Sequence, residues 1–297
     1  MDTTICAVVA AIWPGMPADV APLSGGITNT NYKVEVAGEV FVVRLAGERT
    51  ELLGIDRASE VAACKMAASL GIGPELVHLD LTQGVFVTRF IEGSPVPPEQ
   101  VGVEPIVGEM ATALRRIHAA GSIHATFNTF ELVPAYRALA AQSGVAPGFD
   151  DASMLRSLER VAAVRPWQPA ALCHNDLLNS NLIHDGQVRI VDWEYAGMGD
   201  CFFDLANLAV NHHFTASQDE ALLGHYFGIV SEPQMSALQL FKLASEAREA
   251  MWGVLQLAIS TLQIDFEAYA AEHAGGYFEI LDSIDLEPTL AAAAALQ

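Results

Sequence analysis

The hydrophobic positions in the first third of the chain follow the alternating period of β-strands. Residues 31–36 alternate between apolar and polar side chains, residues 40–45 form a β-branched run, and Gly38 lies between them. This arrangement predicts a β-hairpin with Gly38 in its turn. Two further short strands are expected over residues 76–79 and 85–91.

Helical spacing occurs at two places in the same region. A short helix is expected near the start of the chain, and residues 56–70 carry apolar side chains at the period of an α-helix. Asp56 is a suitable N-cap for this second helix, Gly71 is a suitable C-cap, and Pro74 follows. These signals predict a helix that ends close to Gly71.

The pattern changes at residues 92–95, where the sequence Glu-Gly-Ser-Pro predicts a turn or hinge. Beyond this point the chain is rich in alanine, and its apolar residues recur at helical spacing. The helices predicted from this spacing cover residues 103–120, 152–164, 218–227 and 233–262.

Short apolar runs interrupt these helices, and two of the runs predict a second hairpin. Residues 171–173 form one run, and residues 181–184 and 188–191 flank an Asp185-Gly186 turn. An Asp-Gly pair between apolar runs is a strong hairpin signal.

The length and composition of the chain agree with two folded lobes. The chain has 297 residues, of which 52% are hydrophobic and 17% are charged, as expected for a globular protein with a large core. We therefore predict an α+β, bilobal fold. A small β-rich N-terminal lobe is expected over residues 1–92, and a larger, mainly helical C-terminal lobe over residues 93–297.

The charge of the chain restricts its partners. Asp and Glu number 36 against 15 Lys and Arg, which gives a formal net charge of −21. Such a surface repels phosphate backbones and anionic lipids, and no apolar run is long enough to span a bilayer. We expect neither nucleic-acid binding nor membrane insertion. A cationic ligand would be attracted, although an acidic surface also simply keeps a protein soluble. The four cysteines form no CxxC pair, which indicates reduced thiols and predicts a cytoplasmic protein.

Polar side chains are concentrated at both ends of the second predicted hairpin. His174, Asp176 and Asn181 lie in the loop at its start, and Asp192 and Glu194 follow its last strand. A hairpin returns the chain to its starting end, so these side chains are expected to lie near one another. Carboxylate and amide oxygens are suitable ligands for Mg²⁺. The alternative is that the Asp and Asn residues only stabilise turns.

The spacing of these residues resembles that of a known family. The segment HNDLLNSN resembles the catalytic loop of the protein-kinase-like fold, and DWE resembles the magnesium-binding DFG motif. The longer pattern HxD…N…DxE…GD…DLA resembles the aminoglycoside phosphotransferase superfamily, and HNDL, DWEY and DLAN resemble its choline/ethanolamine kinase family. The resemblance implies a protein-kinase-like fold and a kinase that uses ATP and Mg²⁺.

The resemblance also implies roles for residues of the hairpin. Asp176 is expected to accept the proton of the substrate hydroxyl, and Asn181 and Asp192 to bind the Mg²⁺ that bridges the ATP phosphates. The expected catalytic residues are therefore Asp176, Asn181 and Asp192. Asn181 and Asp192 are the expected metal ligands, with Glu194 near the metal or bound to it. Supporting roles are implied for His174 and Asp204.

A second group of residues is expected to bind the nucleotide. The segment before the first hairpin is rich in glycine, hydroxyl and amide groups, which approach a phosphate closely or donate hydrogen bonds to it. By itself such a segment also fits an ordinary turn. The residues of this group are Gly25, Gly26, Thr28, Asn29, Thr30 and Asn31.

An arginine lies inside the first hairpin, where apolar residues flank it and it needs an anionic partner. The resemblance implies that this residue, Arg44, contacts the ATP phosphates and that Glu60 on the following helix orients it. The alternative for the pair is an ordinary surface ion pair. Phe90 and Ile91 resemble the hinge whose backbone hydrogen-bonds adenine.

The acceptor is expected to bind in the helical lobe, beside Asp176. Trp252 and Tyr269 resemble the aromatic residues that surround the quaternary ammonium in choline kinases, where cation–π attraction holds the cation. A Trp on an apolar helix can equally belong to the core. Asn211 stands where eukaryotic choline kinases carry a carboxylate, and Glu249 where they carry a further Trp. These differences favour ethanolamine or another amino alcohol, because a primary ammonium needs hydrogen-bond acceptors.

The leading hypothesis is a kinase that transfers the γ-phosphate of ATP to the hydroxyl of choline, ethanolamine or a similar small cationic alcohol. A kinase of the same superfamily that acts on thiamine, an aminoglycoside or a sugar is the alternative among enzymes. A kinase-fold protein that binds a nucleotide without turnover is a third possibility. It is disfavoured because the expected base and metal ligands are all present.

Overall fold

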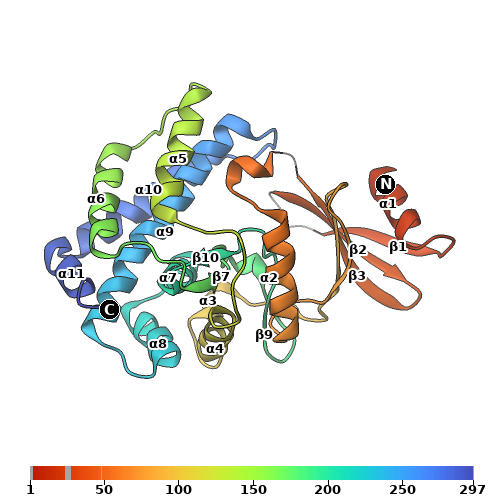
Figure 1. Cartoon of the computed structure of the whole chain (residues 1–297), viewed down its shortest axis with the longest axis horizontal. Helices are drawn as coiled ribbons and strands as arrows, with labels where there is room; N and C mark the ends of the chain where they lie inside the picture. The colour runs from red at the N-terminus through yellow and green to blue at the C-terminus, as the bar shows by residue number, and fades with distance from the viewer. Residues whose placement is uncertain (1–2, 24–27, 48, 297) are drawn as a thin grey trace.

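The computed structural model describes residues 3–23, 28–47 and 49–296. It has the predicted bilobal α+β arrangement, with an antiparallel β-sheet at one side and a larger group of helices at the other (Figure 1). None of the helices in these ranges has the length and apolar character that crossing a bilayer requires.

The N-terminal lobe is built on a five-stranded antiparallel sheet with the strand order β1-β2-β3-β5-β4. Helix α1 (Thr3–Ile12) packs Ile5 and Val9 against the apolar face of the sheet. The ring centroids of Trp13 and Phe41 are 5.1 Å apart. This small core is separate from the core of the helical lobe. The strands are β1 (Ala18–Leu23), β2 (Asn29–Val36), β3 (Glu39–Ala46), β4 (Leu76–Asp80) and β5 (Val85–Arg89).

The first predicted hairpin is confirmed as β2 and β3. Ala37 and Gly38 both have positive φ, 55° and 79°, which is the geometry of a tight turn between antiparallel strands. Strand β1 was not predicted, because it is short, contains Pro22 and exposes half of its side chains. It lies at the edge of the sheet, where a proline is tolerated.

Helix α2 (Arg57–Ser69) follows a short 3-10 turn, η1 (Thr50–Leu53), and agrees with its prediction. Asp56 is the N-cap, and its carboxylate accepts a hydrogen bond of 2.6 Å from the Ser59 amide. Gly71 follows the helix with a φ of +65°. The buried face of α2 carries Glu60, which is fully buried.

The helical lobe surrounds one long central helix, α9 (Glu232–Ile259), which packs against α5, α7, α10 and α11. Almost all residues between positions 237 and 256 are buried. The other helices are α3 (Pro98–Val101), α4 (Ile106–His118), α5 (Thr129–Gln142), α6 (Asp151–Val164), α7 (Cys201–Asn211), α8 (Ala216–Phe227), α10 (Phe266–Ser283) and α11 (Leu286–Ala293).

Five of these helices, α3, α5, α7, α10 and α11, were not predicted from the periodicity of apolar residues, and for α5, α7 and α10 there is a local reason. Helix α5 contains Pro134, and α10 contains the pair Gly275-Gly276, both unfavourable inside a helix. Helix α7 is buried on nearly all sides, so it lacks the polar face that makes a helix recognisable.

Two small sheets carry the segment in which the polar residues of the second hairpin lie. Strand β7 (Ala171–Cys173) pairs with β10 (Gly197–Gly199), and the predicted second hairpin is confirmed as β8 (Leu182–His184) and β9 (Val188–Ile190). A short 3-10 turn, η2 (Asn179–Asn181), precedes β8. The expected turn at residues 92–95 requires a correction, because strand β6 (Ser94–Pro95) pairs with β8.

Candidate active site

The loop after β7 is held by the carboxylate of Asp204, a fully buried residue in the first turn of α7. Its Oδ1 accepts a hydrogen bond of 2.7 Å from the Asn175 amide, and its Oδ2 accepts bonds of 2.8 Å from the His174 amide and 2.9 Å from Nε2 of His118. Burial alone would raise the pKa of Asp204, but these donors outweigh it and the pKa is lowered. Asp204 therefore fixes the backbone of the loop, including Asn175 at a φ of 66°.

The ring of His174 connects the loop to the end of the second hairpin. Its Nε2 lies 3.0 Å from the Val191 carbonyl, and its Nδ1 lies 3.2 Å from the Asp176 amide. A carbonyl can only accept and an amide can only donate, so His174 is a neutral imidazole with its proton on Nε2. Burial lowers its pKa, in agreement with the neutral form.

Asp176 lies in the centre of this loop and is only 9% exposed. Nδ2 of Asn181 donates to its carbonyl at 2.9 Å and lies 3.3 Å from its Oδ2, and Nη1 of Arg248 lies 3.6 Å from its Oδ1. Burial raises the pKa of Asp176 to about 8, even though Arg248 opposes the shift. Arg248 was not predicted, and it is the cation that favours the ionised form of this carboxylate.

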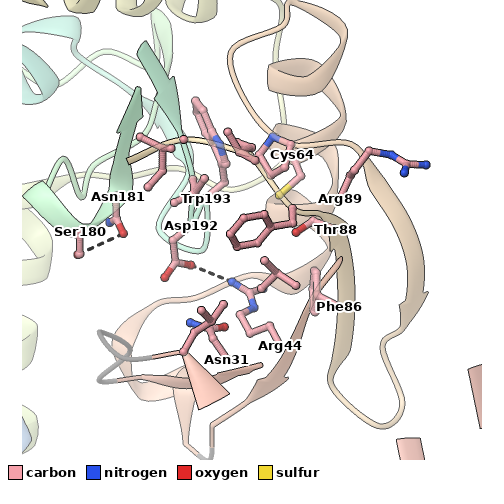
Figure 2. A pocket seen from close by; sticks show the side chains of 18 of the residues that line it. Asn31, Arg44, Cys64, Phe86, Thr88, Arg89, Ser180, Asn181, Asp192 and Trp193 are labelled. Carbon is pink, nitrogen blue, oxygen red and sulfur yellow. Dashed lines mark hydrogen bonds and ion pairs between the residues drawn. The ribbon is translucent and has the colours of Figure 1, made fainter. Parts of the chain in front are cut away.

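The opposite end of the hairpin meets the β-sheet through Asp192. Arg44 on β3 donates from Nη1 to Oδ1 of Asp192 at 2.8 Å, and its Nη2 forms an ion pair with Glu60. Burial disfavours the charge of Arg44, but the carboxylates of Glu60 and Asp192 outweigh it, and the pKa of Arg44 is raised. Figure 2 shows Arg44 and Asp192 facing each other across the space between the two lobes. The expected pair of Arg44 and Glu60 is thus a buried ion pair rather than an exposed one.

These residues border a cleft of about 390 Å³ between the sheet and the second hairpin. Arg89 also borders the cleft, but its guanidinium points away from it (Figure 2). The cleft brings together many of the residues predicted from the sequence. Those that line it are Asn31, Arg44, Glu60, Phe90, Ile91, Asn181 and Asp192.

Within residues 25–31, which were predicted to bind phosphate, Asn31 borders the cleft but the other described residues do not. Asn29 is buried and donates from Nδ2 to Oε2 of Glu194 at 2.8 Å, so it binds a protein carboxylate. Thr30 has an exposed side chain, and Thr28 is partly exposed. The expected phosphate-binding glycines, Gly25 and Gly26, lie outside the described residues.

Glu194 joins the second hairpin to helix α2. Its Oε2 accepts a hydrogen bond of 3.1 Å from Nη1 of Arg57, which also forms an ion pair of 2.8 Å with Glu60. Burial and the nearby charge of Asp192 raise the pKa of Glu194 to about 7. Arg57 was missed in the sequence, although its position three residues before Glu60 on one helix is a recognisable signal.

The donor set of the hairpin fits a magnesium ion. Nδ2 of Asn181 is engaged by Asp176, which fixes the orientation of the amide and leaves Oδ1 with only a 3.5 Å contact from the Ser180 hydroxyl. Asn181 and Asp192 both border the cleft (Figure 2). Mg²⁺ prefers oxygen ligands and is commonly held by few protein groups together with substrate phosphates.

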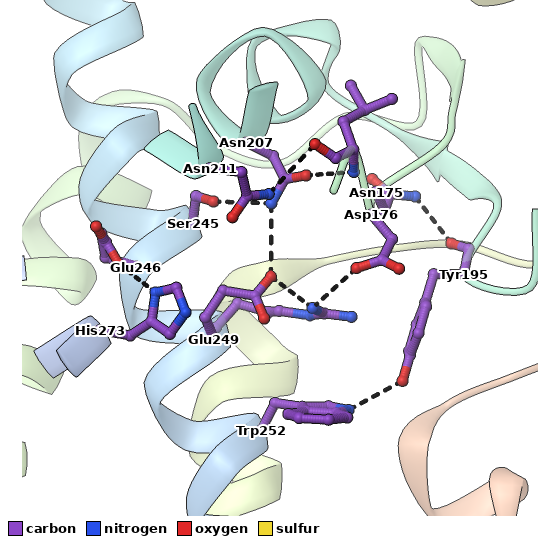
Figure 3. A network of polar contacts seen from close by, with 12 residues as sticks. Asn175, Asp176, Tyr195, Asn207, Asn211, Ser245, Glu246, Glu249, Trp252 and His273 are labelled. Atoms are coloured by element: carbon purple, nitrogen blue, oxygen red, sulfur yellow. Dashed lines mark hydrogen bonds and ion pairs between the residues drawn. The ribbon is translucent and has the colours of Figure 1, made fainter. Parts of the chain in front are cut away.

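Of the predicted acceptor residues, Glu249, Trp252 and Tyr269 lie on α9 and α10, whereas Asn211 ends α7 and Asp176 lies in the loop after β7. Glu249 and Trp252 project from α9 toward the side on which Asp176 lies (Figure 3). Trp252 donates from Nε1 to the Tyr195 hydroxyl at 2.9 Å, and its ring meets that of Tyr269 edge-on with 5.4 Å between centroids. The guanidinium of Arg248 lies over the Tyr195 ring, 4.5 Å from its centroid. We call Tyr195, Arg248, Glu249, Trp252 and Tyr269 the aromatic–ionic cluster.

Glu249 is 1% exposed and both of its oxygens have partners. Oε1 forms an ion pair of 2.6 Å with Arg248, and Oε2 accepts a hydrogen bond of 2.7 Å from Tyr269. Burial would raise the pKa of Glu249, but Arg248 outweighs it and the pKa is lowered. Asn211, the other position that differs from eukaryotic choline kinases, is half-buried and lies 3.5 Å from the Leu177 carbonyl through Nδ2.

Comparison with known proteins agrees with the motifs and the fold. A model described as "Phosphotransferase enzyme family" matches residues 19–241. Human "Ethanolamine kinase 2" is 31% identical over 301 residues, which cover 86% of this chain and 74% of the relative. The chain belongs to the choline/ethanolamine kinase family of these phosphotransferases. Its members transfer phosphate to an alcohol group, so the chain is a phosphotransferase with an alcohol acceptor.

Solved structures of the family have the same fold. A "choline/ethanolamine kinase family protein" from Mesorhizobium loti has a TM-score of 0.84 and 30% identity, with 99% of each chain covered. A structure of LicA in complex with AMP has a TM-score of 0.75 and 23% identity, with 94% of this chain and 99% of that chain covered. The similarity to LicA shows a shared fold alone.

The main functional residue that the sequence analysis missed is Arg248. The adjacent residues Arg248 and Glu249 form a charged pair in the middle of a helix that is otherwise rich in Ala, Leu and Met. Charged residues are almost never fully buried unless they are paired. The charged pair is visible in the sequence. Its importance becomes clear only from the structure, which shows that this part of α9 is buried on all sides.

Proposed function

We propose that this protein transfers the γ-phosphate of ATP to the hydroxyl of choline, ethanolamine or a similar small amino alcohol. The observation that carries the proposal is the convergence of Asp176, Asn181 and Asp192 at the second hairpin, with Arg44 of the opposite lobe bound to Asp192. We further propose that residues 1–92 form the nucleotide-binding lobe and residues 93–297 the lobe that binds the acceptor.

Asn181 and Asp192 would hold Mg²⁺, which when bound neutralises the charge that develops on the transferred phosphoryl group. Arg44 adds a positive charge at the same side of the cleft, and Glu60 holds its guanidinium in place. Phe90 and Ile91 border the cleft where adenine would lie, at the junction between the lobes. These residues position and neutralise the triphosphate, which is the main source of catalysis in phosphoryl transfer.

Asp176 would accept the proton of the acceptor hydroxyl as the oxygen attacks phosphorus. Its position is fixed from three sides, by the His174 ring at its amide, by Asn181 at its carbonyl and by Arg248 at its carboxylate. A base with a fixed orientation assists the departure of the proton when its carboxylate is ionised, and Arg248 favours that form against the burial that raises its pKa. The aromatic–ionic cluster next to Asp176 would bind the remainder of the acceptor.

An assay of ADP release tests this proposal. The purified chain is incubated with ATP and Mg²⁺ and with choline, ethanolamine, thiamine, sugars or aminoglycosides, and the phosphorylated atom is identified by phosphorus NMR. We expect ADP release with an amino alcohol, loss of activity when EDTA removes Mg²⁺, and a phosphate ester on the hydroxyl. Activity with a sugar or aminoglycoside alone would contradict the choice of acceptor. If none of the compounds causes ATP to be consumed, the proposal as a whole is contradicted.

A further inference from the structure

Arg248 is a fully buried arginine with an incomplete set of partners. Its side chain is 2% exposed, and its Nη1 contacts Glu249 and Asp176. Its Nε and Nη2 are buried and have no hydrogen-bond partner among the described residues. A buried donor without a partner is destabilising, and more so when it carries charge. Native proteins usually complete such groups with water or a ligand.

The same guanidinium already covers the ring of Tyr195, one of the aromatic residues of the cluster. Arg248 lies 4.5 Å from the centroid of Tyr195, and Tyr195 is held in place by the hydrogen bond from Trp252. A quaternary ammonium cannot donate hydrogen bonds, so it depends on the open faces of aromatic rings. A second cation placed on this ring would be repelled by Arg248. A quaternary ammonium such as that of choline is therefore disfavoured on the Tyr195 ring.

The charges around Arg248 favour a neutral oxygen as its missing partner. Nη1 already has the carboxylates of Glu249 at 2.6 Å and Asp176 at 3.6 Å. Both oxygens of Glu249 are engaged, one by Arg248 and one by Tyr269. A further carboxylate beside Nε and Nη2 would be repelled by these two acids, whereas a hydroxyl oxygen would accept a hydrogen bond without that repulsion.

We propose that Arg248 selects the acceptor of the kinase: Nε and Nη2 donate hydrogen bonds to a second hydroxyl of the acceptor, and the guanidinium excludes a quaternary ammonium from Tyr195. The acceptor class is a small polyhydroxylated alcohol, with an aminodiol as the simplest member that keeps an amino group. This inference rests on the proposed function, because it names the acceptor of the same site.

The test compares acceptors that differ in one group at a time. Choline has a quaternary ammonium and one hydroxyl, ethanolamine has a primary ammonium and one hydroxyl, and 2-amino-1,3-propanediol adds a second hydroxyl. Turnover is measured with ATP and Mg²⁺, and equilibrium binding is measured by calorimetry with ADP and Mg²⁺. We expect the wild-type chain to prefer the aminodiol over choline by at least about tenfold in both measurements, the effect of one hydrogen bond to a charged group.

Two variants separate the hydrogen bonds of Arg248 from its charge. The double variant Arg248→Met with Glu249→Gln removes the buried pair together, so that Glu249 is not left as an unpaired carboxylate, although Asp176 also loses its contact with Arg248. We expect its binding of choline to tighten roughly tenfold and its binding of the aminodiol to weaken roughly tenfold. The variant Arg248→Lys keeps the charge but loses the planar set of donors. It should still bind choline poorly and should lose the preference for the aminodiol.

Arg165 provides a matched control. Its guanidinium lies 5.5 Å from the centroid of Phe202, pairs with Asp200 at 2.6 Å and also has a buried Nε without a partner among the described residues. Arg165→Met should leave the ratio of aminodiol to choline binding unchanged. Circular dichroism confirms that each variant is folded before it is compared.

The outcomes separate this inference from the proposed function. If the wild-type chain binds choline as tightly as the aminodiol, or binds neither, the role of Arg248 is overturned. The same holds if the double variant leaves the binding ratio unchanged, because the unpaired donors then have only a structural role. If binding follows the expected ratio but ATP is consumed with none of the acceptors, the proposed function fails while the selection by Arg248 stands.

Discussion

The catalytic loop and the aromatic–ionic cluster are both buried polar networks, but they are satisfied to different degrees. In the loop, the carboxylate of Asp204 accepts three hydrogen bonds and both nitrogens of His174 have partners, while the neutral amide oxygen Oδ1 of Asn175 has none among the described residues. In the cluster, Arg248 leaves two buried donors without partners among the described residues. A nearly satisfied network of charged groups fixes one geometry, whereas charged donors without partners can be completed by water or a ligand. We therefore expect the loop to fix the reaction and the cluster to select the acceptor.

The largest effect is expected from a substitution of Asp176, the proposed base. Asp176→Asn keeps the size of the side chain but removes its ability to accept a proton, so kcat should fall about 10³-fold while nucleotide binding changes little. Steady-state kinetics and ADP titration measure the two effects. Asp185→Asn, in the turn of the same hairpin, is the control, because Asp185 forms only an ion pair with Arg189. Equal turnover by Asp176→Asn and the control would remove Asp176 from the reaction.

A large effect on stability is expected from Asp204. Asp204→Asn loses a buried carboxylate that accepts three hydrogen bonds, and urea unfolding at pH 7 should show a loss of about 3 kcal/mol. The pKa of Asp204 is lowered in the folded protein, so its contribution is present above the unfolded value near 3.8 and is lost as the pH falls through the lower folded value. The difference between wild type and variant should therefore shrink below pH 4. A difference that is independent of pH would show that the charge of Asp204 is not the cause.

On the nucleotide side, Arg44 should affect the use of ATP more than that of the acceptor. Arg44→Met removes a buried cation bound to Asp192, and kcat/KM for ATP should fall about a hundredfold. Arg44→Lys keeps a charge and should be intermediate. Arg89→Met on the neighbouring strand is the control, because Arg89 pairs with the exposed carboxylates of Glu39 and Glu75. A loss of the same size in the control would mean that the ion pair of Arg44 has no special role.

The smallest expected effect tests whether Trp252 contributes to acceptor binding or only to the core. Trp252→Phe preserves an aromatic ring but removes the 2.9 Å hydrogen bond to Tyr195, so KM for the acceptor should rise roughly fivefold and KM for ATP should not change. Trp167→Phe is the control, since the Trp167 indole donates to the Phe127 carbonyl at 2.8 Å. If neither KM moves, Trp252 belongs only to the core.

Local signals in the sequence predicted much of the fold. The two hairpins and helix α2 were recognised because their turns and caps depend on neighbouring residues, such as Gly38 and Asp56. Strand β1 and helices α5, α7 and α10 were missed because their local patterns are weak or contradictory. Their conformations are stabilised by packing against other elements, which periodicity does not record.

The residues of the candidate site divide in the same way, into those that local sequence predicted and those that only the tertiary structure placed. The sequence by itself determined the reaction class, because the loop, the hairpin and the acids at its ends lie within one short segment whose motifs resemble those of a known phosphotransferase family. The pairing of Arg44 with Glu60 was also predicted, because the resemblance to the protein-kinase-like fold implies it. Only the tertiary structure placed Arg248 against Asp176 and over Tyr195. These contacts join separate elements and depend on how α9 is rotated in the helical lobe, which is decided by packing on all of its sides.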